Sequence, residues 1–193
     1  AKKHGWFLAR QFQNPANPAY HASTTGPEIL RDFAGRRLDY FVTGWGTGGT
    51  MSGAGRVLKA ARPDLKIVTS EPAVAALLDG KDWSPHKIQG WTPDFVPEVL
   101  DRSIYDANIP IDDITARDTS RRLASEEGLF VGISAGATVA AALKAAETAE
   151  PGSVLLAMLP DTGERYLSTF LFEDVNEGSD DDWLRDFEDA GLP

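Results

Sequence analysis

The sequence of 193 residues contains no cysteine. This absence excludes disulfide bonds, a thiol nucleophile and metal sites built from thiolates, and it is compatible with the cytoplasm. Long hydrophobic runs are also missing, since none approaches the ~18 residues that a membrane-spanning helix needs. We expect no secretory signal before the fold. Together these absences predict a cytoplasmic protein without a membrane partner.

Histidine and basic charge are scarce as well. His4, His21 and His86 have no carboxylate or second histidine at ligand spacing, so we expect no metal site. The formal net charge is -10 at pH 7, which argues against nucleic acid because that ligand attracts basic surfaces. Most of this charge follows residue 172, where nine acidic residues accompany one arginine. The body of the chain is therefore nearly neutral, and the acidity belongs to a tail.

Strand-like and helix-like patterns alternate along the chain. The apolar run over 153–159, bounded by Gly152 and Pro160, is typical of a central parallel strand. Two Asn-Pro steps predict a loop over 13–18, and residues 73–97 are rich enough in glycine and proline to predict another. We expect strands over 5–9, 39–44, 66–71 and 153–159, and helices over 25–33, 51–61, 112–127 and 135–149. The alternation predicts an α/β fold with a parallel sheet.

The most informative segment is the glycine-rich turn Gly-Trp-Gly-Thr-Gly-Gly-Thr over residues 44–50. It follows an expected strand and precedes an expected helix. Glycines let the backbone approach an anion, successive N–H groups point at it, and the helix dipole favours negative charge there. The segment therefore predicts a site for a phosphate group.

Two kinds of phosphate ligand fit this turn. Gly44, Gly46 and Gly49 match the dinucleotide pattern G-x-G-x-x-G, and Glu71 ends the next expected strand where that fold places its ribose-binding acid. Alternatively, residues 46–50 form a cup for one phosphate monoester, to which threonine hydroxyls add donors. A turn that only packs a helix on a strand does not require those threonines.

A second junction of this type lies at residues 132–137, where glycines flank Ser134. We expect a strand over 129–134 to lead into the following helix, so that Ser134 lies at the carboxyl end of a strand, where α/β folds bind ligands. A plain helix N-cap, worth about 1 kcal/mol, explains the same serine. The local sequence leaves both interpretations open.

Six motifs occur in the order found in one enzyme family. Their residues are 11–18, 24–28, 46–50, 86–90, 132–137 and 163–169. The sequence from Gln11 to about Phe172 resembles the cysteine synthase (O-acetylserine sulfhydrylase) and cystathionine β-synthase family of fold type II pyridoxal 5′-phosphate (PLP) enzymes. The resemblance implies a three-layer α/β domain of the tryptophan synthase β type, without its N-terminal part.

The resemblance also implies a domain organisation. Residues 1–20 would be the trailing part of the small domain and a connector. Residues 21–175 would form the large domain that binds the PLP phosphate, and residues 176–193 an acidic tail.

The resemblance assigns roles to individual residues. The PLP phosphate would be held by Gly46, Thr47, Gly48, Gly49 and Thr50. Ser134 would lie at the pyridine nitrogen, where a neutral hydroxyl leaves that nitrogen unprotonated. Gln11 would border the pocket for the substrate carboxylate, and Gly90 would lie beside the substrate amine. Under this assignment the position of Glu71 is incidental.

The lysine that forms the Schiff base in this family has no counterpart here. Lys2 and Lys3 precede the first expected strand and are not assigned to the cofactor. The catalytic residue is therefore unknown, and we expect this chain alone to be inactive.

The implied reaction is a β-replacement that makes L-cysteine from O-acetylserine and sulfide. Asp94-Phe95 and residues 99–102 are also similar to cystathionine β-synthase, which condenses serine with a thiol. The family further implies a homodimer and serine acetyltransferase as a partner. Two other classes stay open: a non-catalytic phosphate-binding fragment, and an NAD-binding Rossmann domain.

Overall fold

The computed structural model describes residues 1–175 and 184–185. The predicted acidic tail therefore lies outside the described residues, except for Leu184 and Arg185. The helices are α1 (Ala16–Ser23), α2 (Thr25–Asp32), α3 (Gly49–Ala61), α4 (Asp113–Glu127) and α5 (Ile133–Ala146), and the strands are β1 (Tyr40–Gly44), β2 (Lys66–Ser70), β3 (Ala107–Asn108) and β4 (Leu155–Ala157). Three short 3-10 turns are η1 (Lys2–His4), η2 (Leu77–Asp79) and η3 (Gly163–Tyr166).

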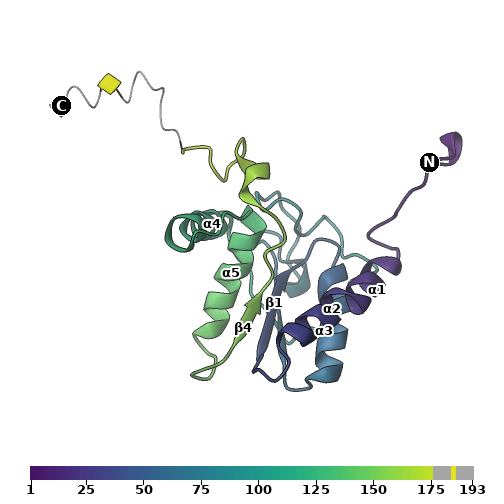
Figure 1. The fold of residues 1–193 in the computed structure, drawn as a ribbon. Helices are drawn as coiled ribbons and strands as arrows, with labels where there is room; N and C mark the ends of the chain where they lie inside the picture. The colour runs from purple at the N-terminus through teal and green to yellow at the C-terminus, as the bar shows by residue number, and fades with distance from the viewer. Residues whose placement is uncertain (176–183, 186–193) are drawn as a thin grey trace.

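The four strands form one parallel sheet in the order β3-β2-β1-β4. Helices α1, α2 and α3 lie on one side of β1, and α4 and α5 lie on the other (Figure 1). Because a strand is pleated, successive side chains point to opposite faces of the sheet. Phe41 belongs to the core under α2 and α3, and Val42 to the core under α5. The predicted α/β fold with three layers is confirmed.

Strand β4 was expected at the centre of the sheet, and within the described residues this is wrong. It pairs with β1 alone, and its three residues are only half-buried. A fully apolar run shows that a strand packs against helices, but it does not show how many strands flank it.

The expected buried strand over residues 5–9 is also wrong. Trp6, Phe7 and Leu8 are 71%, 89% and 59% exposed, and the segment extends away from the body (Figure 1). No described strand pairs with it, so the segment has no place in the sheet and its apolar side chains do not pack into the core.

The expected loop over residues 13–18 ends early, because α1 begins at Ala16. Asn14 accepts a hydrogen bond through Oδ1 from the backbone N–H of Ala16, 3.0 Å away. Pro18 falls in the first turn of the helix, where its missing N–H has no intrahelical partner to lose. An Asn-Pro step thus starts this helix rather than preventing it.

The segment before Ser134 is not the expected strand either. Val131 forms only an isolated antiparallel bridge with Thr162, and Gly132 is the N-cap of α5. This helix ends at Ala146, three residues before the predicted end.

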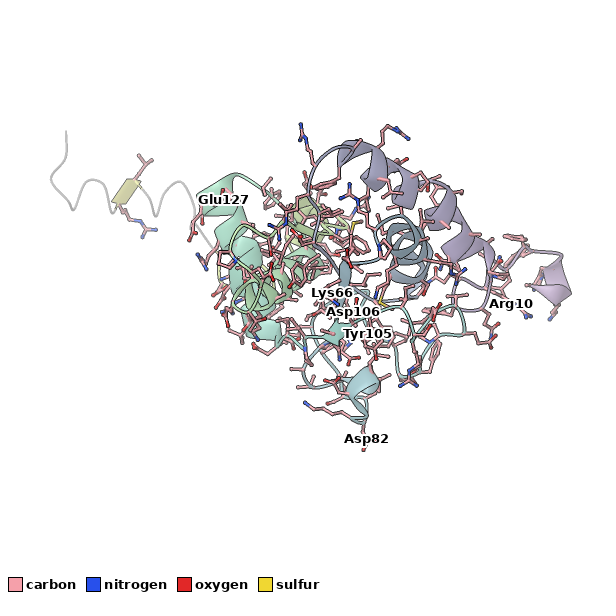
Figure 2. The ribbon with its side chains drawn as sticks, turned by 90° about the horizontal axis from the view of Figure 1, so that it is seen from below. Arg10, Lys66, Asp82, Tyr105, Asp106 and Glu127 are labelled. Atoms are coloured by element: carbon pink, nitrogen blue, oxygen red, sulfur yellow. The ribbon has the colours of Figure 1, made fainter. Side chains whose placement is uncertain are left out.

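The long connection over 73–97 is mostly loop, as predicted, and contains only the turn η2. Figure 2 shows Asp82 at its outer tip, and Lys66, Tyr105 and Asp106 together near the start of β2. Asp106 accepts hydrogen bonds from Lys59 Nζ and from the N–H of Ile67, each at 2.7 Å. None of the helices in the described part of the chain has the length and apolar character needed to cross a membrane.

Candidate active site

A cleft of about 360 Å³ lies where the carboxyl ends of β1 and β4 meet. Four segments line it: the β1–α3 junction, residues 89–91, the first turns of α5, and the residues after β4. In open α/β sheets ligands bind at this edge. The two predicted ligand sites meet at this one cleft: Ser134 lines it, and so do Gly46, Thr47 and Thr50 of the glycine-rich turn, whereas Gly48 and Gly49 of that turn do not.

The glycine-rich turn has the predicted place between a parallel strand and a helix N-terminus, since β1 ends at Gly44 and α3 starts at Gly49. Gly48 has φ +82°, and a Cβ there would lie 2.4 Å from Leu100 Cδ1. A Cβ on Gly46 would lie 2.2 Å from the carbonyl oxygen of Gly90. Only glycine allows this turn to fold against both neighbours.

The hydroxyl of Thr47 is oriented by two donors. Its Oγ1 accepts from Asn17 Nδ2 at 2.9 Å and from the N–H of Gly49 at 3.2 Å. A hydroxyl has two acceptor positions and one proton. Because both acceptor positions are used, the proton of Thr47 is left to donate, and Thr47 lines the cleft.

Helix α1 also contacts the second hydroxyl of the turn. His21 lies between Thr25 and Thr50, with Nδ1 2.9 Å from Thr25 Oγ1 and Nε2 3.3 Å from Thr50 Oγ1. Burial lowers the pKa of His21, which favours the neutral ring. The sequence interpretation missed α1 as a support for this turn. Asn17 and His21 stand four residues apart, the spacing of one helix face, and this was the available signal.

Ser134 is not the N-cap of α5, so the plain capping interpretation is wrong. It lies in the first turn of the helix and is only 4% exposed. Its backbone carbonyl accepts from Thr138 Oγ1 at 3.0 Å. Ser134 lines the cleft.

Asp161 and Tyr166 also line this end of the cleft, and sequence reasoning missed both. Asp161 Oδ1 lies 3.5 Å from Ser134 Oγ, while its Oδ2 accepts from the Tyr166 hydroxyl. Burial, followed by this bond to Asp161, raises the pKa of Tyr166 to about 12. Asp161 follows the expected strand over 153–159 closely, so its place at a carboxyl strand end was a usable signal.

The two residues that the resemblance placed near the substrate, Gly90 and Gln11, differ in their position. Gly90 lines the cleft. Gln11 is exposed and outside the cleft lining, although its backbone carbonyl accepts from Asn17 Nδ2 at 2.9 Å; its role toward substrate stays a prediction.

Glu71, the acid of the dinucleotide interpretation, is fully buried and does not line the cleft. It accepts from the N–H of Leu78 at 3.2 Å and from Asn108 Nδ2 at 2.6 Å. Burial raises the pKa of its carboxyl group. Its hydrogen bonds are thus to the protein itself, which leaves the dinucleotide interpretation without its ribose contact.

The donors around the cleft fit PLP. The turn offers threonine hydroxyls and the N-terminus of α3 for a phosphate, and Ser134 offers a neutral hydroxyl for a ring nitrogen. A family model described as "Pyridoxal-phosphate dependent enzyme" matches residues 1–161. The chain belongs to this family. As a member of the PLP-dependent enzymes, it uses pyridoxal 5′-phosphate as its cofactor.

Two curated relatives place the chain within the PLP-dependent enzymes. It is 66% identical over 184 residues to O-ureido-L-serine synthase of Streptomyces lavendulae, covering 95% of this chain and 57% of that relative. It is 47% identical over 171 residues to cysteine synthase of Staphylococcus aureus, covering 89% of this chain and 55% of the relative. The predicted family resemblance is confirmed, and the chain spans little more than half the length of these relatives.

Solved structures agree with this placement. The crystal structure of O-ureido-L-serine synthase superposes with a TM-score of 0.90 at 66% identity, over 96% of this chain and 58% of that one. O-acetyl serine sulfhydrylase isoform 3 from Entamoeba histolytica gives 0.85 at 39% identity, over 92% and 53%. The fold is therefore that of the fold type II PLP enzymes.

Proposed function

We propose that this chain provides the PLP-binding part of an enzyme that replaces a leaving group on the β-carbon of an activated L-serine. The observation that carries the proposal is the single cleft into which both the glycine-rich turn and Ser134 open. Its volume of about 360 Å³ suits one small cofactor with an amino acid. When bound, PLP withdraws electrons from the α-carbon of the amino acid, so that the α-proton and the leaving group can depart.

In this proposal the residues of this chain anchor and orient the cofactor. The turn over 46–50 holds the phosphate, and Ser134 meets the ring nitrogen. Gly90 and Gly46 bring two backbone segments together at the cleft wall, which leaves room for substrate beside the backbone. In the replacement, the bond between the β-carbon and the acetate oxygen breaks, and acetate leaves with the electron pair. The nucleophile loses a proton and forms a new bond to the β-carbon, so that atoms and charge balance.

The proposed reaction would require an amine beside the cofactor to move the α-proton. Among the described residues no lysine lines the cleft; Lys87 Nζ, for example, lies 4.0 Å from the ring centroid of Phe170. We therefore propose that the amine comes from a segment outside this sequence.

Two nucleophiles fit the comparisons. Sulfide would give L-cysteine, the product expected from the sequence. An O-ureido group on serine carries O–NH–CO–NH2 on the β-carbon, so the matching nucleophile is hydroxyurea. The higher identity to O-ureido-L-serine synthase, 66% against 47% for cysteine synthase, favours hydroxyurea.

The test uses the full-length protein that contains this chain, loaded with PLP and supplied with O-acetylserine. Sulfide and hydroxyurea are added separately and then in competition, and products are identified by mass spectrometry. We expect O-ureido-L-serine to form, and to predominate in competition. Cysteine alone would restore the sulfide assignment, and no acetate release with either nucleophile would contradict β-replacement.

A further inference from the structure

Trp91 lines the cleft, and the proposed function gives it no role. Its indole occupies the space beside Gly44, since a Cβ on that glycine would lie 1.9 Å from Trp91 Cζ2 and 2.0 Å from Trp91 Cε2. The side chain that Gly44 lacks is thus replaced by the ring of another residue. Because Gly44 is the last residue of β1, this ring lies at the carboxyl edge of the sheet, where α/β folds bind ligands.

The indole lies between the two ends of the cleft. Val42 belongs to the core under α5, and Gly44, two residues later on the same strand, faces the same side of the sheet. Trp91 belongs to that core too, together with Ile133 in the first turn of α5. Gly44 begins the glycine-rich turn, and Ile133 directly precedes Ser134. A ligand held by both the turn and Ser134 would therefore lie across the indole.

The residue after Trp91 fixes the indole in place. Thr92 has a backbone φ of +31°, which is a strained value for a β-branched residue. Its N–H donates to the carbonyl oxygen of Trp45 at 2.9 Å, and its own carbonyl accepts from Trp83 Nε1 at 2.9 Å. Such strain persists only where the surroundings determine the backbone. Trp91, only 8% exposed, is therefore held in position before a ligand arrives.

We propose that the indole of Trp91 is the floor on which the pyridine ring of the cofactor lies. Offset-stacked or edge-to-face aromatic rings attract each other by more than the apolar area they bury. The turn then binds the phosphate, Ser134 meets the ring nitrogen, and Trp91 binds the ring itself. This inference rests on the cofactor site of the proposed function. It adds that the site has affinity for the ring without the phosphate.

The experiment separates contacts to the ring from contacts to the phosphate. Full-length apoprotein is titrated by calorimetry with pyridoxine 5′-phosphate, with pyridoxine and with inorganic phosphate. Pyridoxine lacks the aldehyde of pyridoxal, so no Schiff base forms and only non-covalent contacts are measured. Trp91→Leu should weaken both ring-bearing ligands about 3- to 10-fold and leave phosphate unchanged. Trp91→Phe keeps an aromatic ring and should recover most of this loss.

The matched control is Phe95→Leu, which removes an aromatic ring outside the cleft lining. Phe95 is 46% exposed and packs edge-on against Phe12, with 5.2 Å between the ring centroids. This variant should leave the affinity for all three ligands unchanged.

A second measurement uses the wild-type sequence, with its tryptophans labelled by fluorine. The Trp91 resonance is identified by its absence from the spectrum of Trp91→Phe. We expect pyridoxine to shift this resonance, because a bound aromatic ring changes the magnetic field at the indole, and we expect inorganic phosphate to leave it in place.

The outcomes separate this inference from the proposed function. A Trp91 resonance that stays in place when pyridoxine binds overturns the inference, even if Trp91→Leu fails to fold. Equal losses for phosphate and for the ring-bearing ligands in Trp91→Leu overturn it as well, because they would make Trp91 a core residue only. A wild-type protein that binds neither pyridoxine 5′-phosphate nor PLP would instead contradict the cofactor site and the proposed function with it.

Discussion

Asn17 and Thr47 stand 30 positions apart in the sequence, yet their side chains meet at 2.9 Å. Together with the N–H of Gly49, this amide on α1 therefore determines where the hydroxyl proton of Thr47 in the glycine-rich turn points. Thr47 is a residue of the predicted site, whereas Asn17 lies outside the cleft lining and contacts Thr47. A donor whose direction is fixed before a ligand arrives loses less conformational freedom on binding.

This geometry predicts a selective effect of Asn17→Ala. The Thr47 proton becomes free to turn away from the phosphate, so the affinity for PLP should fall about 5- to 10-fold, the worth of roughly one hydrogen bond. Pyridoxal, which lacks the phosphate, should bind the variant and the wild type equally. Both affinities are measured by absorbance titration of the full-length apoprotein.

The matched control is Gln13→Ala, at an exposed residue in the turn just before α1, which should change neither affinity. In a Thr47→Val background the Asn17→Ala effect should vanish, because no hydroxyl is left to orient. Equal losses for PLP and pyridoxal would assign Asn17 to folding rather than to phosphate orientation.

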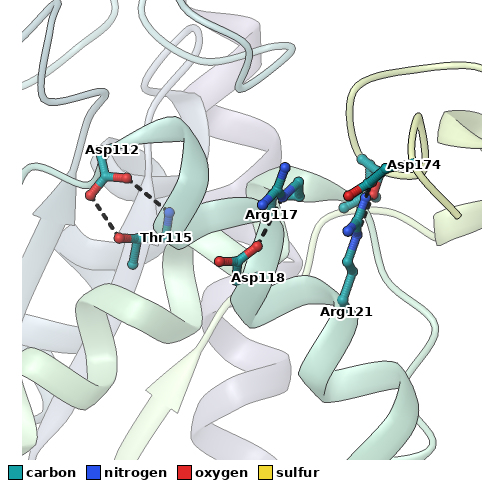
Figure 3. Close-up of polar contacts among 7 residues, drawn as sticks. Asp112, Thr115, Arg117, Asp118, Arg121 and Asp174 are labelled. Atoms are coloured by element: carbon teal, nitrogen blue, oxygen red, sulfur yellow. Dashed lines mark hydrogen bonds and ion pairs between the residues drawn. The ribbon is translucent and has the colours of Figure 1, made fainter.

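Helix α4 shows how one element is held at its start and along its length (Figure 3). Asp112 is its N-cap and accepts from the N–H of Thr115 at 2.8 Å and from Thr115 Oγ1 at 2.6 Å. Arg117 and Asp118 form an ion pair at the surface, and Arg121 bonds Asp174 beyond η3. The cap serves the helix itself, whereas the Arg121 contact joins it to a later segment.

We predict that Asp112→Ala lowers the free energy of unfolding by about 1 kcal/mol, the usual worth of an N-cap. Asp118→Ala should stay within about 0.5 kcal/mol, as is typical of an exposed pair. The hydrogen bonds from Thr115 lower the pKa of Asp112. Its contribution is therefore present above the ordinary pKa of an aspartate and is lost as pH falls through the lowered value.

Urea denaturation at neutral and at acidic pH measures both effects. The difference between wild type and Asp112→Ala should narrow in acid, while the Asp118→Ala difference stays small. A cap effect that grows as pH falls would contradict the assigned role of the carboxylate.

For the whole molecule, the N-terminal segment is the most exposed apolar feature of the described chain, with Phe7 89% exposed. Neighbouring apolar side chains in water favour association. We predict that the 193-residue chain self-associates, and that replacing Trp6 and Phe7 by serine shifts it toward monomer. Sedimentation velocity measures the distribution, and Val74→Ser, at a residue 50% exposed elsewhere, is the control. A monomeric wild-type chain would contradict the prediction.

The sequence could predict features that depend on neighbouring residues, but not those that depend on contacts between segments far apart in the chain. The turn over 46–50 and helix α4 carry local signals, glycine conformation and capping, and both were predicted. The edge position of β4 and the exposure of residues 5–9 depend on which strands lie alongside, which apolar content does not encode. Asp161 was missed because its contact with Ser134 joins segments 27 positions apart. Gly90 and Gln11 were placed by resemblance alone, and only Gly90 lies in the cleft lining.

The strand order also has a consequence for folding kinetics. In the pairing of β1 with β2, Tyr40 lies opposite Lys66, 26 positions later in the sequence. Beside β1 and β4, by contrast, the N–H of Val154 donates to Asp39 Oδ2 across 115 positions. Closing the longer loop costs about 1.3 kcal/mol more chain entropy. The unit β1-α3-β2 can therefore assemble first, with β4 arriving late. Substitutions in β4 should then mainly accelerate unfolding, while those in β1 should slow folding.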